Sequence, residues 1–187
     1  RSRGTNSNEP SRFLKHKVIL EEQVDEIDGD FSSDVTLKTS FYPDKTQKIL
    51  TRNKSPDIGF STSINPYKGC EHGCVYCFAR PTHAYLDLSP GIDFETKIFY
   101  KTNAVKLMHK ELDKAGYVCS PIALGTNTDP YQPVEKSLEV TRQLIGGLSE
   151  RKHPLTIVTK STLIERDLDL LAGLATKNLV NVNVSIT

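Results

Sequence analysis

The sequence predicts an α/β protein with a largely parallel sheet. From residue 58 onward, short apolar runs alternate with longer segments whose apolar residues recur at helical spacing, as in consecutive βαβ units. The connections between these segments are short, and the 187 residues are enough for one domain with a sizeable core. We therefore expect one folded unit over residues 57–187.

Residues 1–56 are predicted to form a polar N-terminal extension. Residues 1–17 are mainly basic, residues 21–34 are acidic without a single base, and residues 38–54 are basic again. Such blocks are typical of a flexible end, and they would also suit a basic arm that contacts a phosphate backbone. A short strand is predicted at Lys17–Leu20.

The first predicted unit surrounds a cluster of cysteines. Residues 59–64 read as a short strand, and Pro66 keeps the residue before it extended, so a loop begins there. Gly69 and Gly73 allow that loop to turn tightly. A helix is predicted over Val75–Leu86, kinked or restarted at Pro81.

The remaining units follow the same alternation. Strands are predicted at residues 94–100, 121–125, 155–159 and 179–186. Helices are predicted between them, over residues 104–115, 134–148 and 164–175, from apolar residues that share one helical face. The chain ends on a predicted strand with no helix after it, which predicts a fragment truncated at its C-terminus.

The last predicted strand alternates strictly between apolar and polar residues. Its apolar positions are Val180, Val182, Val184 and Ile186, and its polar positions are Asn181, Asn183 and Ser185. If the apolar side meets helices, the polar side faces a lumen that can hold a ligand. A half-exposed strand in an ordinary sheet would give the same pattern.

Composition limits the function classes. The formal net charge is +1, so the overall field gives no argument for nucleic acid. No apolar run is long enough to span a membrane, and no secretory signal is visible. Four cysteines, three of them clustered, favour a reducing cytoplasm.

The clustered cysteines follow the spacing C-x3-C-x2-C, at Cys70, Cys74 and Cys77. An iron–sulfur cluster fits three thiolates, because one iron then stays free for another ligand. A zinc site remains an alternative, although its fourth ligand is missing from the loop. A disulfide framework would leave an odd thiol. Cys119 is expected to be a small buried residue, and His72 and His83 are expected to support the site or lie on the surface.

The loop, with Tyr76 just before its last cysteine, resembles the signature of the radical S-adenosylmethionine (radical SAM) superfamily. The runs NPYKGCEHGCVYCFARPTHAYL, GTNTDPYQPVEK and IVTKS resemble its spore photoproduct lyase branch, often described as DNA-repair photolyase-like. The resemblance implies an α/β partial (β/α)6 TIM-like barrel of the radical SAM type. It also implies a [4Fe–4S] cluster on the three cysteines and S-adenosylmethionine as cofactor.

Strand order alone predicts where the site lies, because ligands of (β/α) barrels sit at the carboxyl ends of the strands. These ends are the cysteine loop, residues 126–129, residues 159–161 and residues 185–187. The resemblance then implies cofactor contacts: Tyr76 at the adenine, Asn127, Thr128 and Asp129 at the amino group and ribose, Lys160 at the carboxylate, and Ser185 at the ribose.

The expected function is that of a cytoplasmic radical SAM enzyme. Reductive cleavage of S-adenosylmethionine would give a 5′-deoxyadenosyl radical that abstracts hydrogen from an unknown substrate, with lyase-like DNA repair as one candidate. The resemblance implies a flavodoxin- or ferredoxin-like electron donor. The alternative is a zinc-binding module that binds nucleic acid through the basic arm, without catalysis.

Overall fold

The computed structural model describes residues 4–5, 7–12 and 38–186 and has a mixed α/β architecture with two sheets. The larger sheet has the strand order β2-β3-β6-β7-β8, and its last four strands are parallel while β2 is antiparallel to β3. These strands are β2 (Leu50–Arg52), β3 (Thr62–Ile64), β6 (Ile122–Leu124), β7 (Leu155–Thr159) and β8 (Val180–Val184). The predicted α/β class and the largely parallel sheet are confirmed.

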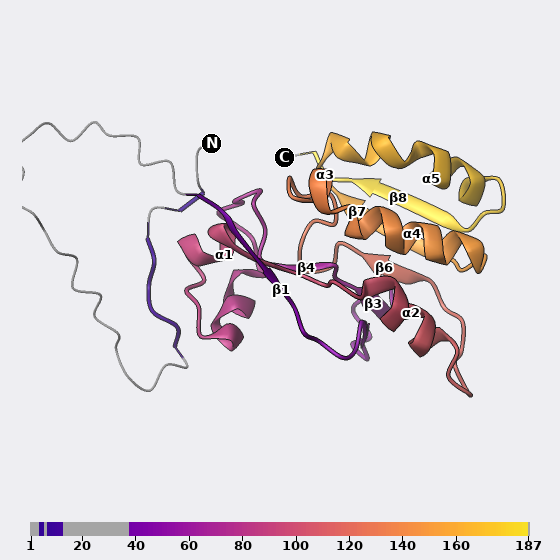
Figure 1. Ribbon diagram of the computed structural model, residues 1–187, viewed down its shortest axis with the longest axis horizontal. Helices are drawn as coiled ribbons and strands as arrows, with labels where there is room; N and C mark the ends of the chain where they lie inside the picture. The colour runs from indigo at the N-terminus through magenta and orange to yellow at the C-terminus, as the bar shows by residue number, and fades with distance from the viewer. Residues whose placement is uncertain (1–3, 6, 13–37, 187) are drawn as a thin grey trace, which may run out of the picture.

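Three helices cover one face of the larger sheet (Figure 1). They are α2 (Ala104–Leu112), α4 (Val140–Glu150) and α5 (Leu168–Ala175). Met108, Leu144 and Leu171 from these helices join one buried cluster with Ile122 and Ile157 of the strands. The core therefore lies between the helices and this face, as the helical spacing of the apolar residues predicts.

The opposite face of the larger sheet carries mainly small or polar side chains, with Val158 as a larger apolar one. Ser63, Ala123, Thr156 and Asn181 are register partners on four adjacent strands, so they form one row across it. The alternation of β8 therefore places its asparagines away from the helices, as predicted. Val182 and Val184 remain 39% and 59% exposed, because β8 is an edge strand. Within the described residues the sheet does not close into a barrel; β2 and β8 are its edges.

A second sheet of three strands stands beside the first and has the order β1-β5-β4. Its strands are β1 (Ser40–Pro43), β5 (Lys97–Tyr100) and β4 (Tyr67–Lys68). The strand predicted over 94–100 is corrected here, since Ile92–Thr96 forms the short helix α1 and only the second half is extended. The Phe94 N–H donates to the Gly91 carbonyl (3.2 Å), which closes a helical turn after Pro90.

Two predicted helices also differ in the structure. The helix predicted from Val75 begins only at Arg80, as the 3-10 helix η1 (Arg80–Leu86), because Pro81 suits a first turn and the preceding residues form turns. The helix predicted over 134–148 is divided into α3 (Glu135–Leu138) and α4 by Glu139, whose φ is 52°. A second 3-10 helix, η2 (Thr162–Asp167), precedes α5.

The predicted N-terminal extension is partly integrated into the fold. Both β1 and β2 lie before residue 57, yet they pair with β5 and β3. Among the first twelve residues, Ser11 Oγ donates to the Ala84 carbonyl (3.1 Å) and the Ser7 carbonyl accepts from Ile92 (3.0 Å). The strand predicted at Lys17–Leu20 lies outside the described residues. Among the described helices, none has the length and apolar character that crossing a membrane would need.

Candidate active site

The cysteine loop leaves the carboxyl end of β3 by way of β4 and turns at two glycines. Gly69 and Gly73 have φ values of 81° and 65°, in the left-handed region that other residues rarely adopt. A Cβ atom at Gly69 would lie 2.9 Å from the Phe94 carbonyl oxygen, and one at Gly73 would lie 2.9 Å from Glu95 Oε2. Both positions therefore require glycine for conformation and for space.

The three cysteines of the loop differ in their surroundings. Cys70 is buried, and its N–H donates to the Phe94 carbonyl (2.9 Å). Burial, assisted by the nearby charge of Asp129, raises the pKa of its thiol to about 12. Cys74 and Cys77 are half-buried, and their backbones are joined by a turn in which Cys77 N–H donates to the Cys74 carbonyl (3.2 Å). All three thiols are free, so none is consumed in a disulfide.

Gln132, which follows β6, fixes the backbone on both sides of Cys70. Its Nε2 donates to the Gly69 carbonyl (3.0 Å), and its Oε1 accepts from the Glu71 N–H (3.0 Å). The side chain is fully buried. Sequence reasoning missed this residue, because it contacts only backbone atoms of the loop. Its position in the run TDPYQPVEK was the one available signal.

Arg80 holds the other half of the loop. Its Nε donates to the Cys74 carbonyl (2.9 Å), and its Nη2 pairs with the fully buried Glu95. The guanidinium also donates to the carbonyls of Pro90 and Gly91 and lies 5.4 Å from the ring centre of Phe94. Arg80 therefore joins the loop to α1, and the loop backbone is fixed from two sides.

Asp129 connects the end of β6 to the end of β7 and to the loop. Its Oδ1 accepts from Thr159 Oγ1 (2.6 Å), and its Oδ2 accepts from the Lys160 N–H (2.9 Å) and lies 3.4 Å from His72 Nε2. Burial opposes ionisation of this carboxyl, but the nearby His72 and hydrogen bonds from Thr159 and backbone N–H groups outweigh burial and hold its pKa below the ordinary value. The carboxylate is thus engaged by the chain itself.

Lys160 brings the end of β7 to the cysteines. Its Nζ donates to Cys74 Sγ (3.2 Å), and this contact is the largest cause that raises the pKa of the exposed ammonium. Tyr76 of the loop is 65% exposed. Lys160, a predicted cofactor residue, and Cys74, a predicted cluster ligand, are 86 positions apart in the sequence and adjacent in the structure.

The other predicted cofactor residues line the same end of the sheet. The exposed Asn127 donates its N–H to Asn65 Oδ1 (3.0 Å), and the buried Thr128 donates its hydroxyl to the Tyr67 carbonyl (3.0 Å). Ser185, just past β8, is exposed and donates its N–H to the Thr159 carbonyl (2.8 Å). The predicted convergence of strand ends is thus present, while the Thr128 hydroxyl, like the Asp129 carboxylate, is used within the fold.

The two histidines near the loop lie in supporting positions. His83 is fully buried, and its Nε2 lies 2.9 Å from the Lys97 carbonyl oxygen, with its ring edge-on to Phe94. His72 lies beside Asp129. Cys119, in contrast, is exposed, so its predicted burial is wrong; it lies in the extended connection before β6 rather than in the sheet.

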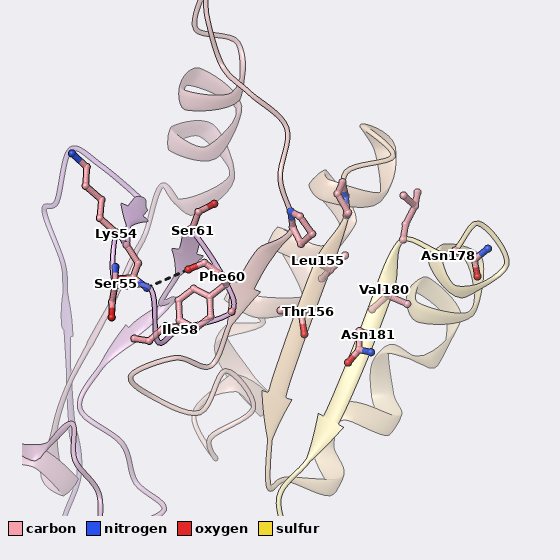
Figure 2. A pocket seen from close by; sticks show the side chains of 15 residues that line it. Lys54, Ser55, Ile58, Phe60, Ser61, Leu155, Thr156, Asn178, Val180 and Asn181 are labelled. Carbon is pink, nitrogen blue, oxygen red and sulfur yellow. Dashed lines mark hydrogen bonds between the residues drawn. The ribbon is translucent and has the colours of Figure 1, made fainter.

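Two cavities lie at opposite ends of the larger sheet. One, of about 840 Å³, opens at the amino ends of the strands, where Leu155, Asn178 and Val180 line it (Figure 2). The other, of about 660 Å³, lies at the carboxyl ends and is lined by residues that include Asn65, Asn127 and Thr128. Only the second cavity, of these two, shares residues with the predicted cofactor site.

The donor set of the loop suits an iron–sulfur cluster. It offers three free thiols on a backbone that glycines, Gln132 and Arg80 hold in place, and thiolates are the usual ligands of such clusters. Within the residues that the structure describes, no three His, Cys, Asp or Glu side chains converge as a single metal ion would require.

The Gln132 contacts predict a measurable role for that side chain. We expect Gln132→Leu to lower the free energy of unfolding by about 1–3 kcal/mol, because it leaves a buried N–H and a buried carbonyl of the loop without partners. Iron content after anaerobic reconstitution should fall as well. Urea unfolding and iron analysis measure the two effects. Gln143→Leu, the same change on the exposed surface of α4, is the control; equal results for the two variants would contradict the role.

The sequence model of the radical SAM superfamily matches residues 64–187 of this chain. The uncharacterized protein Mb2609c of Mycobacterium bovis is 45% identical over 137 residues, which are 72% of this chain and 40% of the relative. Rv2578c of Mycobacterium tuberculosis, also uncharacterized, matches at the same identity and coverage.

A more distant match comes from an archaeon. The uncharacterized protein MJ0683 of Methanocaldococcus jannaschii is 29% identical over 143 residues, 76% of this chain and 49% of the relative. The chain therefore spans between two fifths and one half of the length of these curated relatives. No solved structure matches it.

Proposed function

The chain belongs to the radical SAM superfamily, and from that premise we propose that it carries the cofactor-binding part of an enzyme that starts radical chemistry on a substrate. Members of this superfamily are enzymes that use a [4Fe–4S] cluster and S-adenosylmethionine. The observation that carries the proposal is the contact of Lys160 Nζ with Cys74 Sγ (3.2 Å), which joins a strand end to the cysteine loop.

The proposed ligands of the cluster are Cys70, Cys74 and Cys77. A [4Fe–4S] cluster bound there would supply one electron to S-adenosylmethionine, and cleavage of a carbon–sulfur bond of its sulfonium would give methionine and the 5′-deoxyadenosyl radical used for hydrogen abstraction. Gln132 and Arg80 hold the loop backbone so that the thiols keep their spacing. This fixed spacing is the protein's contribution to cluster binding.

The remaining roles concern the cofactor. We propose that Lys160 binds the methionine carboxylate, since its ammonium already lies at the loop. Tyr76 would lie against the adenine and Ser185 near the ribose. Asn127, Thr128 and Asp129 would recognise the amino group and ribose. For Thr128 and Asp129 this requires contacts beyond those that their side chains make in the fold.

Beyond the α/β class, we propose that the fold is a partial (β/α)6 barrel of the TIM type. The parallel strands β3, β6, β7 and β8 would form its wall, with the helices outside and the row of small polar residues inside. The row of small or polar side chains on that face supports this proposal, because a lumen that holds a ligand needs small and polar positions.

Within the superfamily, we propose that the chain belongs to the spore photoproduct lyase branch, because its sequence segments around the cysteines and after β6 resemble that branch. A lyase-type reaction, with nucleic acid as a candidate substrate, follows from that resemblance. We also propose a flavodoxin- or ferredoxin-like electron donor. A reducing cytoplasm suits the free cysteines of the loop.

The test is anaerobic reconstitution with iron and sulfide, followed by dithionite reduction with S-adenosylmethionine present. Electron paramagnetic resonance follows the cluster, and chromatography follows 5′-deoxyadenosine. We expect a [4Fe–4S] signal that changes when the cofactor is added, with release of 5′-deoxyadenosine. Retention of one zinc ion per chain and no cluster would overturn the proposal and favour the zinc-binding alternative.

A further inference from the structure

The cavity of about 660 Å³ at the carboxyl ends of the strands is placed to receive a substrate. It lies between the segment around β2, the ends of β3 and β6, and the helix η1 that follows the cysteine loop. Asn127 and Thr128, both proposed cofactor contacts, line it. Its volume is typical of sites that bind small molecules. A group bound here would therefore lie next to the proposed cofactor.

The lining of this cavity is strongly cationic. Four basic residues, Lys48, Arg52, Lys68 and Lys101, contribute to it, and no aspartate or glutamate does. The chain as a whole has 24 basic and 23 acidic residues, so this local excess does not reflect the overall charge. Such a concentration of positive charge at a concave wall makes the local electrostatic potential positive, and a positive potential attracts anions.

Two of these lysines share a single carboxylate. Lys101 Nζ lies 2.7 Å and Lys68 Nζ lies 3.2 Å from the same Oδ2 atom of Asp44. The Lys101 and Asp44 side chains are only 9% and 10% exposed, and the Lys68 side chain is 40% exposed. The cluster of Lys68, Asp44 and Lys101 therefore keeps one positive charge in excess within a partly buried wall.

Burial makes that excess charge costly unless an anion accompanies it. Burial lowers the pKa of Lys101, although its pairing with Asp44 opposes the shift. The Lys101 N–H also donates to the Pro66 carbonyl (3.2 Å), which fixes the backbone beneath its side chain. Glu111, another carboxylate in this region, accepts hydrogen bonds from the backbone N–H groups of Ile49 (2.6 Å) and Leu50 (3.3 Å). These bonds are to the backbone rather than to the two lysines.

We propose that this cavity binds the phosphate of a phosphate-bearing substrate, with Lys68 and Lys101 as its donors and Lys48 and Arg52 adding positive field. Lysine ammonium groups bind phosphate as point charges, and the arginine guanidinium binds it through its planar fork, so both types of basic residue in this lining suit a phosphate. The apolar Ile49, Leu50 and Leu86 beside them offer a surface for the organic part. The role of the bound group as a substrate rests on the proposed radical enzyme, whereas the phosphate site itself does not.

Binding can be measured on the cluster-free chain by titration calorimetry. Inorganic phosphate, glycerol 3-phosphate and a short single-stranded oligonucleotide serve as probes, so that a free phosphate ester and a nucleic acid backbone are compared. We expect Lys68→Gln with Lys101→Gln, and separately Lys48→Gln with Arg52→Gln, to weaken binding by about tenfold or more, as loss of charge-assisted hydrogen bonds and field implies.

Lys106→Gln with Lys110→Gln removes two charges from the exposed surface of α2 and is the matched control. It should leave the affinity of the small phosphates unchanged. If the Lys68 and Lys101 variant fails to melt cooperatively, the Lys48 and Arg52 variant decides the question, because neither of its residues is buried. Equal affinity in all variants, or no binding of any probe, overturns the proposal.

Two further measurements separate this proposal from the proposed function. Displacement of phosphate by S-adenosylmethionine would show that the cavity belongs to the cofactor, and would overturn it as a substrate site. Release of 5′-deoxyadenosine is measured independently on the reconstituted chain. Phosphate binding without cofactor cleavage supports the site and contradicts the proposed function, while cleavage with no phosphate binding contradicts the site alone.

Discussion

Replacement of Cys74 by alanine is expected to abolish both the [4Fe–4S] signal and the release of 5′-deoxyadenosine. The three cysteines are the proposed ligands of three irons, and thiolate ligands of such clusters have no substitute within the loop. The loss should be complete rather than graded, because the loop has no fourth cysteine that could replace Cys74. Iron and sulfide analysis with electron paramagnetic resonance after anaerobic reconstitution measures the effect.

Cys119→Ala is the control for this experiment. Cys119 is the fourth cysteine; it is exposed and precedes β6, away from the loop in the sequence. Its replacement should leave cluster content and cofactor cleavage intact. A Cys74→Ala variant that keeps its full cluster and full cleavage would show that the loop is not the cluster site.

Replacement of Glu135 by alanine is expected to lower the free energy of unfolding by about 3–5 kcal/mol, the range for removing one partner of a buried charge pair. Glu135 is fully buried and receives a hydrogen bond from the Tyr67 hydroxyl. It also accepts from Arg166 Nη2 (2.8 Å) and from the N–H groups of Thr141 (2.9 Å) and Arg142 (3.1 Å). Alanine would leave all four donors without this partner.

Urea unfolding followed by circular dichroism measures this loss. Glu150→Ala, the same substitution at the exposed end of α4, should change the free energy of unfolding by less than about 0.5 kcal/mol. Burial and the Glu135 charge also raise the pKa of Tyr67, so the phenol remains a donor at neutral pH. A loss as small as that of the control would mean that the buried network contributes little to stability.

The sequence predicts the position of the candidate site better than the elements around it. Strand order alone places residues 126–129, 159–161 and 185–187 at one end of a sheet, and the contact between Lys160 and Cys74 agrees with that placement. The reason is physical: parallel strands must end on the same side. Which side chains bind the cofactor stays a prediction.

Other features could not be read from the sequence. Glu139 interrupts a helix in a left-handed conformation without a glycine or proline to signal the break. The strands β1 and β2 have only four and three residues, and each pairs with a strand that lies later in the sequence, β5 or β3. Gln132 and Arg80 contact backbone atoms of the cysteine loop, and the sequence does not indicate which side chains will reach those atoms.

The double attachment of the cysteine loop has a consequence for damage by oxygen. Gln132 and Arg80 reach the loop through hydrogen bonds that involve no cysteine side chain. A zinc finger collapses when its ion is removed, because the ion itself supplies the folding energy. Here the backbone is fixed by groups that oxidation of a cluster would leave untouched. Replacement of the cluster after exposure to air would then require only new iron and sulfide, because the loop that receives them is already folded.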